Sequence, residues 1–168
     1  MKKIFWIAAA AAGLLVTAAC QKEPAAGVEG GDAKVTLTVE IPEVIQTKAM
    51  SQAEHADIVY YEIWNSDWTE QLYPADGVLA SAVVDQRKAT VDVTVIVDQT
   101  YNFVFWAQDK DHTAYDVTDL LNVKVDYSVI AADGNQDKYD AYYAVETIEV
   151  KGSIDQTVTL YRPFAQLN

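Results

Sequence analysis

The strongest structural signal in the chain lies in residues 91–107, which read VDVTVIVDQTYNFVFWA. In the first half valines alternate with Asp92 and Thr94, which is the period-two pattern of a strand with one buried face. Asp98 then interrupts the pattern with a residue that favours turns. Residues 101–107 are apolar at nearly every position. We therefore expect a strand there that is buried on both faces, at the centre of the core.

Similar patterns continue outward along the chain. Residues 35–41 alternate between apolar and polar side chains until Pro42 ends the run. Residues 58–64 have apolar side chains at both odd and even positions, as in a central strand. Further strands are expected at 78–84, the weakest of the set, and at 123–127, 142–150 and 154–161. Residues 118–123 and 51–55 are the segments where brief helical turns are expected.

Seven or eight short strands with few helices predict an all-β fold, an antiparallel β-sandwich over residues 34–168. The chain of 168 residues has the size of one domain. No repeat of 20–50 residues is visible, so a solenoid or a propeller is excluded.

The charge and the residue counts exclude several functions. The chain carries 12 basic and 25 acidic residues, and without Lys2 and Lys3 the net charge becomes −15. Such a charge repels a phosphate backbone, so we expect no nucleic-acid partner. The single cysteine excludes an internal disulfide and a thiolate metal cluster. His55 and His112 offer little for a zinc site or a histidine-based triad.

The N-terminus has the form of a secretory leader that ends at the cysteine. Residues 1–3 are Met-Lys-Lys, and residues 4–19 form an uncharged run of 16 residues. That run is shorter than the ~20 residues of a membrane-spanning helix and fits the apolar region of a signal peptide. The sequence VTAAC at 16–20 resembles a bacterial lipoprotein box, which implies lipidation of Cys20 after removal of residues 1–19. The alternatives are an ordinary signal peptide and a buried cysteine.

Residues 20–33 are expected to be a flexible tether, because their Pro, Ala, Gly and acidic residues cannot bury apolar area. The start of this segment, QKEP at 21–24, has no aspartate directly after Cys20 and so lacks the enterobacterial signal for inner-membrane retention. Its Gln-Lys-acid order resembles the surface-export tags of Bacteroidetes lipoproteins. This resemblance implies lipid anchoring in the cell outer membrane, on its surface side.

The sequence offers little that supports catalysis. Asp109, Asp111, His112 and Asp116 could form a calcium site, but a solvated acidic loop explains them as well. The loop that begins at Asp133 fails the EF-hand template. No nucleophile elbow, metalloprotease helix or phosphate loop occurs. We therefore expect a non-enzymatic protein with no metal and no cofactor.

The aromatic residues near the second expected strand offer a possible binding surface. Trp64 and Trp68, with Tyr60, Tyr61 and Tyr73, could form a platform on which sugar rings stack. The alternative is that Trp64 packs in the core while Trp68 covers one end of the sandwich.

Several segments resemble a known family more specifically. YNFVFWAQ at 101–108 and VTLYRPFAQLN at 158–168 look like signature strands of Bacteroidales lipoproteins related to fimbrillins. NVKVDY at 122–127 and DAYYAV at 140–145 resemble the central segments of the same family. The resemblance runs from about residue 34 to the last residue. It implies a transthyretin-like Greek key of about seven strands and a place in surface fimbriae.

The resemblance also implies an assembly mechanism, in which a protease removes the first strand and a strand from a neighbour replaces it. In this chain the removed strand would be residues 35–41, and Thr47-Lys48-Ala49 looks like the stretch that is cut, after Lys48. The alternative for Lys48 is an ordinary solvated lysine. An anchor subunit would instead keep its first strand and its lipid.

The sequence therefore predicts a lipid-anchored subunit or anchor of fimbriae, whose partners are the outer membrane, other fimbrial subunits, and glycans or proteins of host or bacterial surfaces. Related sequences continue into further strands beyond Asn168, so the chain is either a short member or a fragment. One rival is a carbohydrate-binding surface lipoprotein. A second is an envelope protein that binds a protein partner without polymerising.

Overall fold

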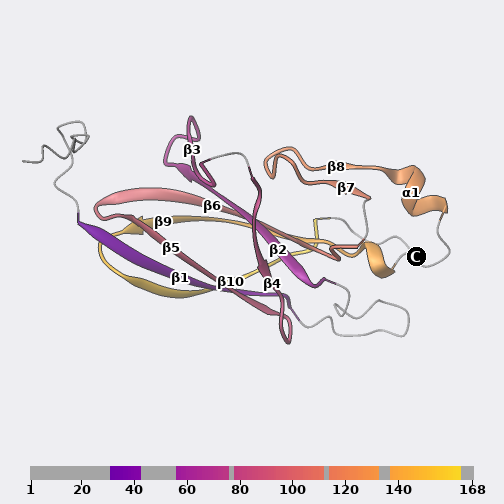
Figure 1. The fold of residues 1–168 in the computed structure, drawn as a ribbon, viewed down its shortest axis with the longest axis horizontal. Coiled ribbons are helices and arrows are strands. Elements are labelled where there is room, and N and C mark those ends of the chain that lie inside the picture. Colours follow the sequence, from indigo (N-terminus) through magenta and orange to yellow (C-terminus); the bar gives the residue numbers. More distant parts are fainter. Residues whose placement is uncertain (1–30, 43–55, 76–77, 112–113, 133–136, 164–168) are drawn as a thin grey trace, which may run out of the picture.

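The computed structural model describes residues 31–42, 56–75, 78–111, 114–132 and 137–163. Figure 1 shows two sheets packed on each other, with a smaller excursion beyond one end of the sandwich. The strands are β1 (Asp32–Glu40), β2 (Ile58–Asn65), β3 (Gln71–Tyr73), β4 (Ala80–Val83), β5 (Lys88–Ile96), β6 (Gln99–Gln108), β7 (Tyr115–Asp116), β8 (Lys124–Val125), β9 (Tyr142–Val150) and β10 (Ile154–Thr159). The helical elements are α1 (Tyr127–Ala132) and a 3₁₀ turn (Asp137–Tyr139).

The predicted all-β sandwich is confirmed. One sheet has the strand order β10-β1-β5, and the other has the order β3-β2-β6-β9, with β4 also paired to β2. β6 is the core strand that its sequence predicts, because β2 and β9 flank it and every residue from Tyr101 to Gln108 is buried. Alternate residues of β1 and β5 point from the other sheet into the same core, as their period-two pattern requires.

The sandwich is not antiparallel throughout. β1 pairs antiparallel with β5 but parallel with β10, in the register Val35 to Ile154 through Glu40 to Thr159. The connection after β9 crosses to the other sheet and delivers β10 running in the same direction as β1. Side-chain periodicity shows which face a residue occupies, but it carries no information on strand direction. The predicted antiparallel sandwich therefore holds for the described strand pairs except β1 with β10, which is parallel.

Three small elements also differ from the sequence expectation. β3 and β7 have only three and two residues and were not predicted. The helix lies at 127–132, where Asp126 Oδ1 accepts hydrogen bonds from the N–H groups of Ser128 and Val129, rather than at 118–123. Residues 118–123 contain a turn in which Asn122 N–H donates to Asp119 O. The predicted turn at 51–55 lies outside the described residues.

A second apolar cluster covers the outer face of the larger sheet. Val104 and Trp106 of β6 pack there with Ala114, Tyr115 and Leu120 from the excursion that carries β7 and β8. The rings of Trp106 and Tyr115 meet edge to face with their centroids 5.3 Å apart. Among the described residues no helix has the length and apolarity needed to cross a membrane.

Candidate functional site

Two of the predicted site residues lie outside the part of the chain that the structure describes. These are Cys20, the predicted lipidation site, and Lys48, the predicted cleavage site. The structure does describe Trp64 and Trp68, as well as the strand that the cleavage hypothesis would remove.

The structure brings Trp64 and Trp68 together where β2 ends. Their ring centroids lie 6.5 Å apart, and the ring planes are tilted by 39°. Trp68 is 37% exposed. Trp64 is half-buried, and its indole Nε1 donates a hydrogen bond of 3.0 Å to Glu62 Oε2. Two neighbouring indoles that retain exposed surface can stack against a ligand with an apolar face.

The turn after β2 fixes the position of Trp68. Asn65 Oδ1 accepts hydrogen bonds from the backbone N–H groups of Thr69 (2.9 Å) and Glu70 (3.1 Å). Asp67 Oδ1 accepts one from Thr69 Oγ1 (2.6 Å), and this bond is the main cause that lowers the pKa of Asp67. Trp68 itself has φ 63°, in the left-handed region that costs L residues roughly 1–2 kcal/mol. A bulky residue held in that conformation suggests a functional constraint.

The tyrosines proposed for the same platform are divided between the two faces of β2. Tyr60 shares the outer face with Trp64, whereas Tyr61 points into the core between the sheets. Tyr61 stacks there on Tyr73, with centroids 5.7 Å apart and an angle of 14° between the rings. Burial and a hydrogen bond with Tyr73 raise the pKa of Tyr61 to about 12. Consecutive strand residues face opposite ways, so Tyr61 and Tyr73 are separated from the tryptophans.

The first strand occupies the middle of the three-stranded sheet. β1 pairs with β5 along Asp32–Glu40 and with β10 along Val35–Glu40. The side chains of Val35, Leu37 and Val39 are completely buried against the opposite sheet. Every second residue of β1 therefore fills the core, while its backbone joins β5 to β10.

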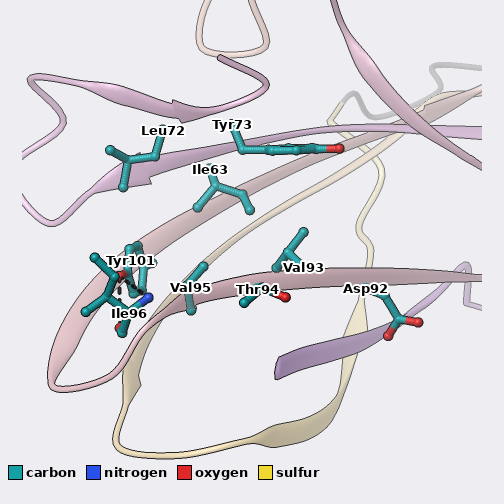
Figure 2. A pocket seen from close by; sticks show the side chains of 9 residues that line it. All are labelled: Ile63, Leu72, Tyr73, Asp92, Val93, Thr94, Val95, Ile96 and Tyr101. Carbon is teal, nitrogen blue, oxygen red and sulfur yellow. Dashed lines mark hydrogen bonds between the residues drawn. The ribbon is translucent and has the colours of Figure 1, made fainter. Parts of the chain in front are cut away.

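An apolar groove of about 360 Å³ lies between β5 and β3 (Figure 2). It is lined chiefly by Val93 and Val95 of β5, Leu72 and Tyr73 of β3, and Ile63 and Tyr101 between them. Tyr101 Oη donates a hydrogen bond to Ile96 O (2.9 Å) and accepts one from Ile96 N–H (3.0 Å), so it caps the end of β5. A second hollow of about 240 Å³ continues toward Gln99 and shares Leu72, Ile96 and Tyr101.

Glu62 is a buried charged residue whose role was not predicted from the sequence. It is 2% exposed, and its Oε1 accepts a hydrogen bond from Leu120 N–H (3.2 Å) while Oε2 accepts the one from Trp64. Glu62 thus connects the tryptophan pair to the loop before β8. The available signal was a lone acidic residue inside the apolar run 58–64.

The acidic residues considered for calcium are used in turns. Asp109 Oδ1 accepts a hydrogen bond from Asp111 N–H (2.8 Å), and Asp116 Oδ1 accepts one from Thr118 Oγ1 (2.7 Å). Lys110 forms ion pairs with Asp57 (3.2 Å) and Asp111 (2.6 Å). Within the described ranges no three His, Cys, Asp or Glu residues are grouped so that they could hold a metal ion. His112 lies outside these ranges.

Comparison with known proteins finds distant structural neighbours. A protein from Bacteroides thetaiotaomicron, provisionally described as polysaccharide-binding (DUF1812), is 15% identical, with 76% of this chain and 46% of that chain covered and a TM-score of 0.49. A fimbrial assembly protein from Parabacteroides distasonis is 8% identical, with 79% and 53% covered and a TM-score of 0.33. The chain spans about half the length of these structures.

These likenesses are too distant to carry an argument about function, and no protein with a curated description matches the chain. One family model covers most of the sequence, including every described strand. It matches residues 27–168 and is described as a family of unknown function (DUF6562), and the chain belongs to that family.

Proposed function

We propose that the protein is a lipid-anchored, non-enzymatic subunit or anchor of surface fimbriae that assembles by β-strand addition. The position of β1 is the observation that carries this proposal. β1 is the first of the described strands, and it lies between β5 and β10 with alternate side chains fully buried.

The geometry of the small sheet explains how a strand could be exchanged. Without β1, the backbone groups of β5 and β10 that now face it would lose their partners. The positions of Val35, Leu37, Val39 and Ile41 would become apolar pockets at every second residue. An extended segment with the same alternation satisfies both requirements, which is the physical basis of strand addition.

The predicted modification sites flank β1 in the sequence. Cys20 precedes Asp32, and Lys48 follows Glu40. Cleavage after Lys48 would leave the lipid on the fragment that contains β1, so the rest of the domain would stay at the membrane only while β1 remained bound. A cleaved chain would thus suit a polymerising subunit, and an uncleaved chain would suit an anchor.

The proposed location is the outer face of the cell outer membrane, with residues 1–19 removed and a tether that begins at residue 20. The tether ends at residue 31 rather than 33, because Asp32 and Ala33 lie in β1. Residues 21–31 separate Cys20 from β1. Fully extended, they would span at most about 40 Å. This length would hold the sandwich close to the membrane until the first strand was exchanged.

Limited digestion of the full chain with trypsin tests the proposal. We expect rapid cleavage after Lys48, retention of the β1 fragment under native conditions, and oligomers of high mass once that fragment is displaced. Lys48→Gln should prevent both cleavage and oligomers. Lys151→Gln, at an exposed lysine paired with Glu149 between β9 and β10, is the matched control and should change neither. A wild-type monomer that trypsin leaves intact at Lys48 would contradict polymerisation by strand exchange.

A second candidate function is carbohydrate binding on the cell surface, because Trp64 and Trp68 lie side by side and Trp68 is exposed. Titration with soluble bacterial and host glycans should then change the tryptophan fluorescence. Trp68→Ala should abolish the change, whereas Tyr127→Ala, at an aromatic residue 67% exposed elsewhere, should preserve it. An equal response of the wild type and the Trp68 variant would refute this function.

A further inference from the structure

The outer edge of β5 is open in the described part of the chain. Val97 N–H donates to Gly31 O, and Ile41 N–H donates to Arg87 O, so the odd-numbered residues of β5 exchange backbone hydrogen bonds with β1. In an antiparallel pair the alternate residues point the other way. The N–H and C=O groups of Thr90, Asp92 and Thr94 therefore face away from β1, and no other described strand pairs with β5 on that side.

Apart from the charge of Asp92, this edge lacks the features that normally block strand pairing. Proteins protect exposed edges with Pro, a bulge or a charged lysine in the strand. From Ala89 to Ile96 the strand has no proline and no lysine, and its register with β1 is continuous. At its two ends, Lys88 pairs with Asp85 and Ile96 is capped by Tyr101 Oη. The remaining edge offers up to three residues for pairing with another strand.

The apolar groove lies directly beside this edge. Val93 and Val95 point into it from β5, and Leu72 and Tyr73 face them from β3 (Figure 2). A strand added next to β5 would place every second side chain on this side, since strand residues alternate between faces. The groove would therefore receive apolar side chains, while the backbone of the added strand paired with the edge.

The charge on the other face of the edge favours a basic partner. Asp92 is half-exposed and carries its carboxylate on the outer face of the small sheet, where Thr36 Oγ1 donates to it (2.6 Å) and Lys34 lies 3.3 Å away. A residue opposite Asp92 on an added strand would lie beside this carboxylate, and opposite charges at such positions stabilise a sheet. The net charge of −13 also attracts basic segments over longer distances.

We propose that the β5 edge and the adjacent groove form a docking site for an extended segment of a partner protein, with apolar side chains at alternate positions and a Lys or Arg opposite Asp92. This site is separate from the β1 slot of the proposed function, because it lies on the opposite edge of β5. A second copy of the chain fits less well. Two β5 strands centred on Asp92 would place the two carboxylates opposite each other.

Binding of short peptides to the full chain tests the proposal. The probe is an eight-residue peptide of alternating Val and Thr with one central Lys in place of a Thr, and its matched control has Glu at that position. We expect the Lys peptide to bind about three- to tenfold more tightly, as a cross-strand charge pair allows. Hydrogen exchange should slow at the amides of Thr90, Asp92 and Thr94, and change little at Val91 and Val93, which already pair with β1.

Variants of the protein separate this site from general charge effects. Asp92→Lys should reverse the preference so that the Glu peptide binds more tightly. The matched control is Asp155→Lys, because Asp155 of β10 lies opposite Thr36 on the other side of β1, in the same row as Asp92. That variant changes the net charge equally and should keep the preference for Lys. Thr94→Pro, which removes an outward N–H, should weaken both peptides.

Four results would overturn the proposal, and three of them come from the peptide experiments. They are no binding at millimolar peptide, protection of amides outside β5, and equal effects of the changes at Asp92 and Asp155. A concentration-dependent dimer with protected β5 amides would identify a second copy as the occupant and would also overturn it.

Discussion

Glu62 shows how one buried side chain links the candidate binding surface to the rest of the fold. Its two carboxylate oxygens accept hydrogen bonds from the Trp64 indole and from the backbone of Leu120. Buried donors are costly when left without partners, so the orientation of Trp64 and the path of the loop before β8 both depend on this carboxylate. The position of the tryptophan pair is thus set partly by a residue that has no direct part in stacking.

We predict that Glu62→Ala lowers the free energy of unfolding by about 2–4 kcal/mol, because it leaves the buried Leu120 N–H and the half-buried Trp64 indole N–H without their acceptor. Glu62→Gln keeps one acceptor oxygen and should cost less. Urea denaturation measures both changes. Glu149→Ala, which removes a surface ion pair with Lys151, is the control and should stay within about 0.5 kcal/mol of the wild type. A Glu62 variant as stable as this control would refute the role given to Glu62.

For single residues, the sequence predicts on which face of a strand a side chain lies. It does not predict contacts that depend on the geometry of a turn. Strand alternation alone separates Tyr60 from Tyr61, and this rule should have divided the proposed aromatic platform. The approach of Trp68 to Trp64 depends instead on the left-handed φ of Trp68 and on the hydrogen bonds of Asn65. Those features arise from the folded turn and cannot be read from composition.

The turn between β4 and β5 holds two residues in an unfavourable backbone conformation, and the resulting loss of stability can be measured. Asp85 and Lys88 exchange backbone hydrogen bonds of 2.8 and 2.9 Å, and the two residues between them, Gln86 and Arg87, have φ of 47° and 66°. Two positive φ values are typical of a type I′ turn, which favours Asn followed by Gly. The sequence places neither residue there.

We predict that Gln86→Asn raises the free energy of unfolding by about 0.5–1 kcal/mol, because Asn tolerates the left-handed conformation better than Gln. Arg87→Gly relieves the strain of the left-handed φ at position 87. It also removes the hydrogen bond from Arg87 Nε to Ile41 O (3.1 Å), so it should raise the free energy of unfolding by less than Gln86→Asn does. Thermal or urea unfolding of the two variants checks this order. The opposite order would show that the Arg87 bond contributes nothing.

The element boundaries show what periodicity can and cannot predict. β9 was predicted with its observed bounds, and β6 was identified as the centre of the core, because their apolar patterns are long. The parallel pairing of β1 with β10 was missed because it depends on a crossing between sheets. Periodicity also could not predict the two-residue β7 or the edge of β5 that no described strand covers, because both depend on which strands pair in the folded protein.

At the scale of the whole molecule, a buried ion pair fixes the chain where it leaves β10 and returns to the larger sheet. Tyr161 exchanges two backbone hydrogen bonds of 2.8 Å with Tyr143 of β9. Arg162 then lies over the Tyr142 ring, and its Nη2 is 2.6 Å from Asp140 Oδ2. Both charged side chains are largely buried, so neither can be removed alone without leaving the other in an apolar site.

We predict that Arg162→Met destabilises the protein by about 3–5 kcal/mol, because Asp140 would keep a buried charge without its cation. The double change Arg162→Met with Asp140→Leu should recover most of this loss, since an apolar pair of similar size avoids the desolvation of both ions. Chemical denaturation of the single and double variants measures the coupling. Additive losses in the double variant would contradict this explanation.

Buried tyrosines make the stability of the whole fold sensitive to alkaline pH. Burial raises the pKa of Tyr61 and of Tyr115 to about 12, with a further contribution at Tyr61 from its hydrogen bond with Tyr73 and at Tyr115 from nearby Asp140. The unfolded chain ionises these phenols near pH 10, whereas the folded chain keeps them neutral. Their contribution to stability is therefore complete below pH 10 and is lost as the pH rises toward 12.

We predict that the free energy of unfolding changes little between pH 7 and 9.5 through these groups and then falls by about 1.4 kcal/mol per pH unit for each tyrosine. Above pH 10, the free energy of unfolding of Tyr115→Phe should fall less steeply with pH, by about 1.4 kcal/mol per pH unit, because one of the two phenols is absent. Its stability at pH 8 should also be lower, because the Tyr139 carbonyl oxygen loses the hydrogen bond from the Tyr115 hydroxyl. Urea titrations at pH 8, 10 and 11 measure both effects. An unchanged alkaline slope in the variant would show that the Tyr115 phenol ionises alike in the folded and unfolded chain.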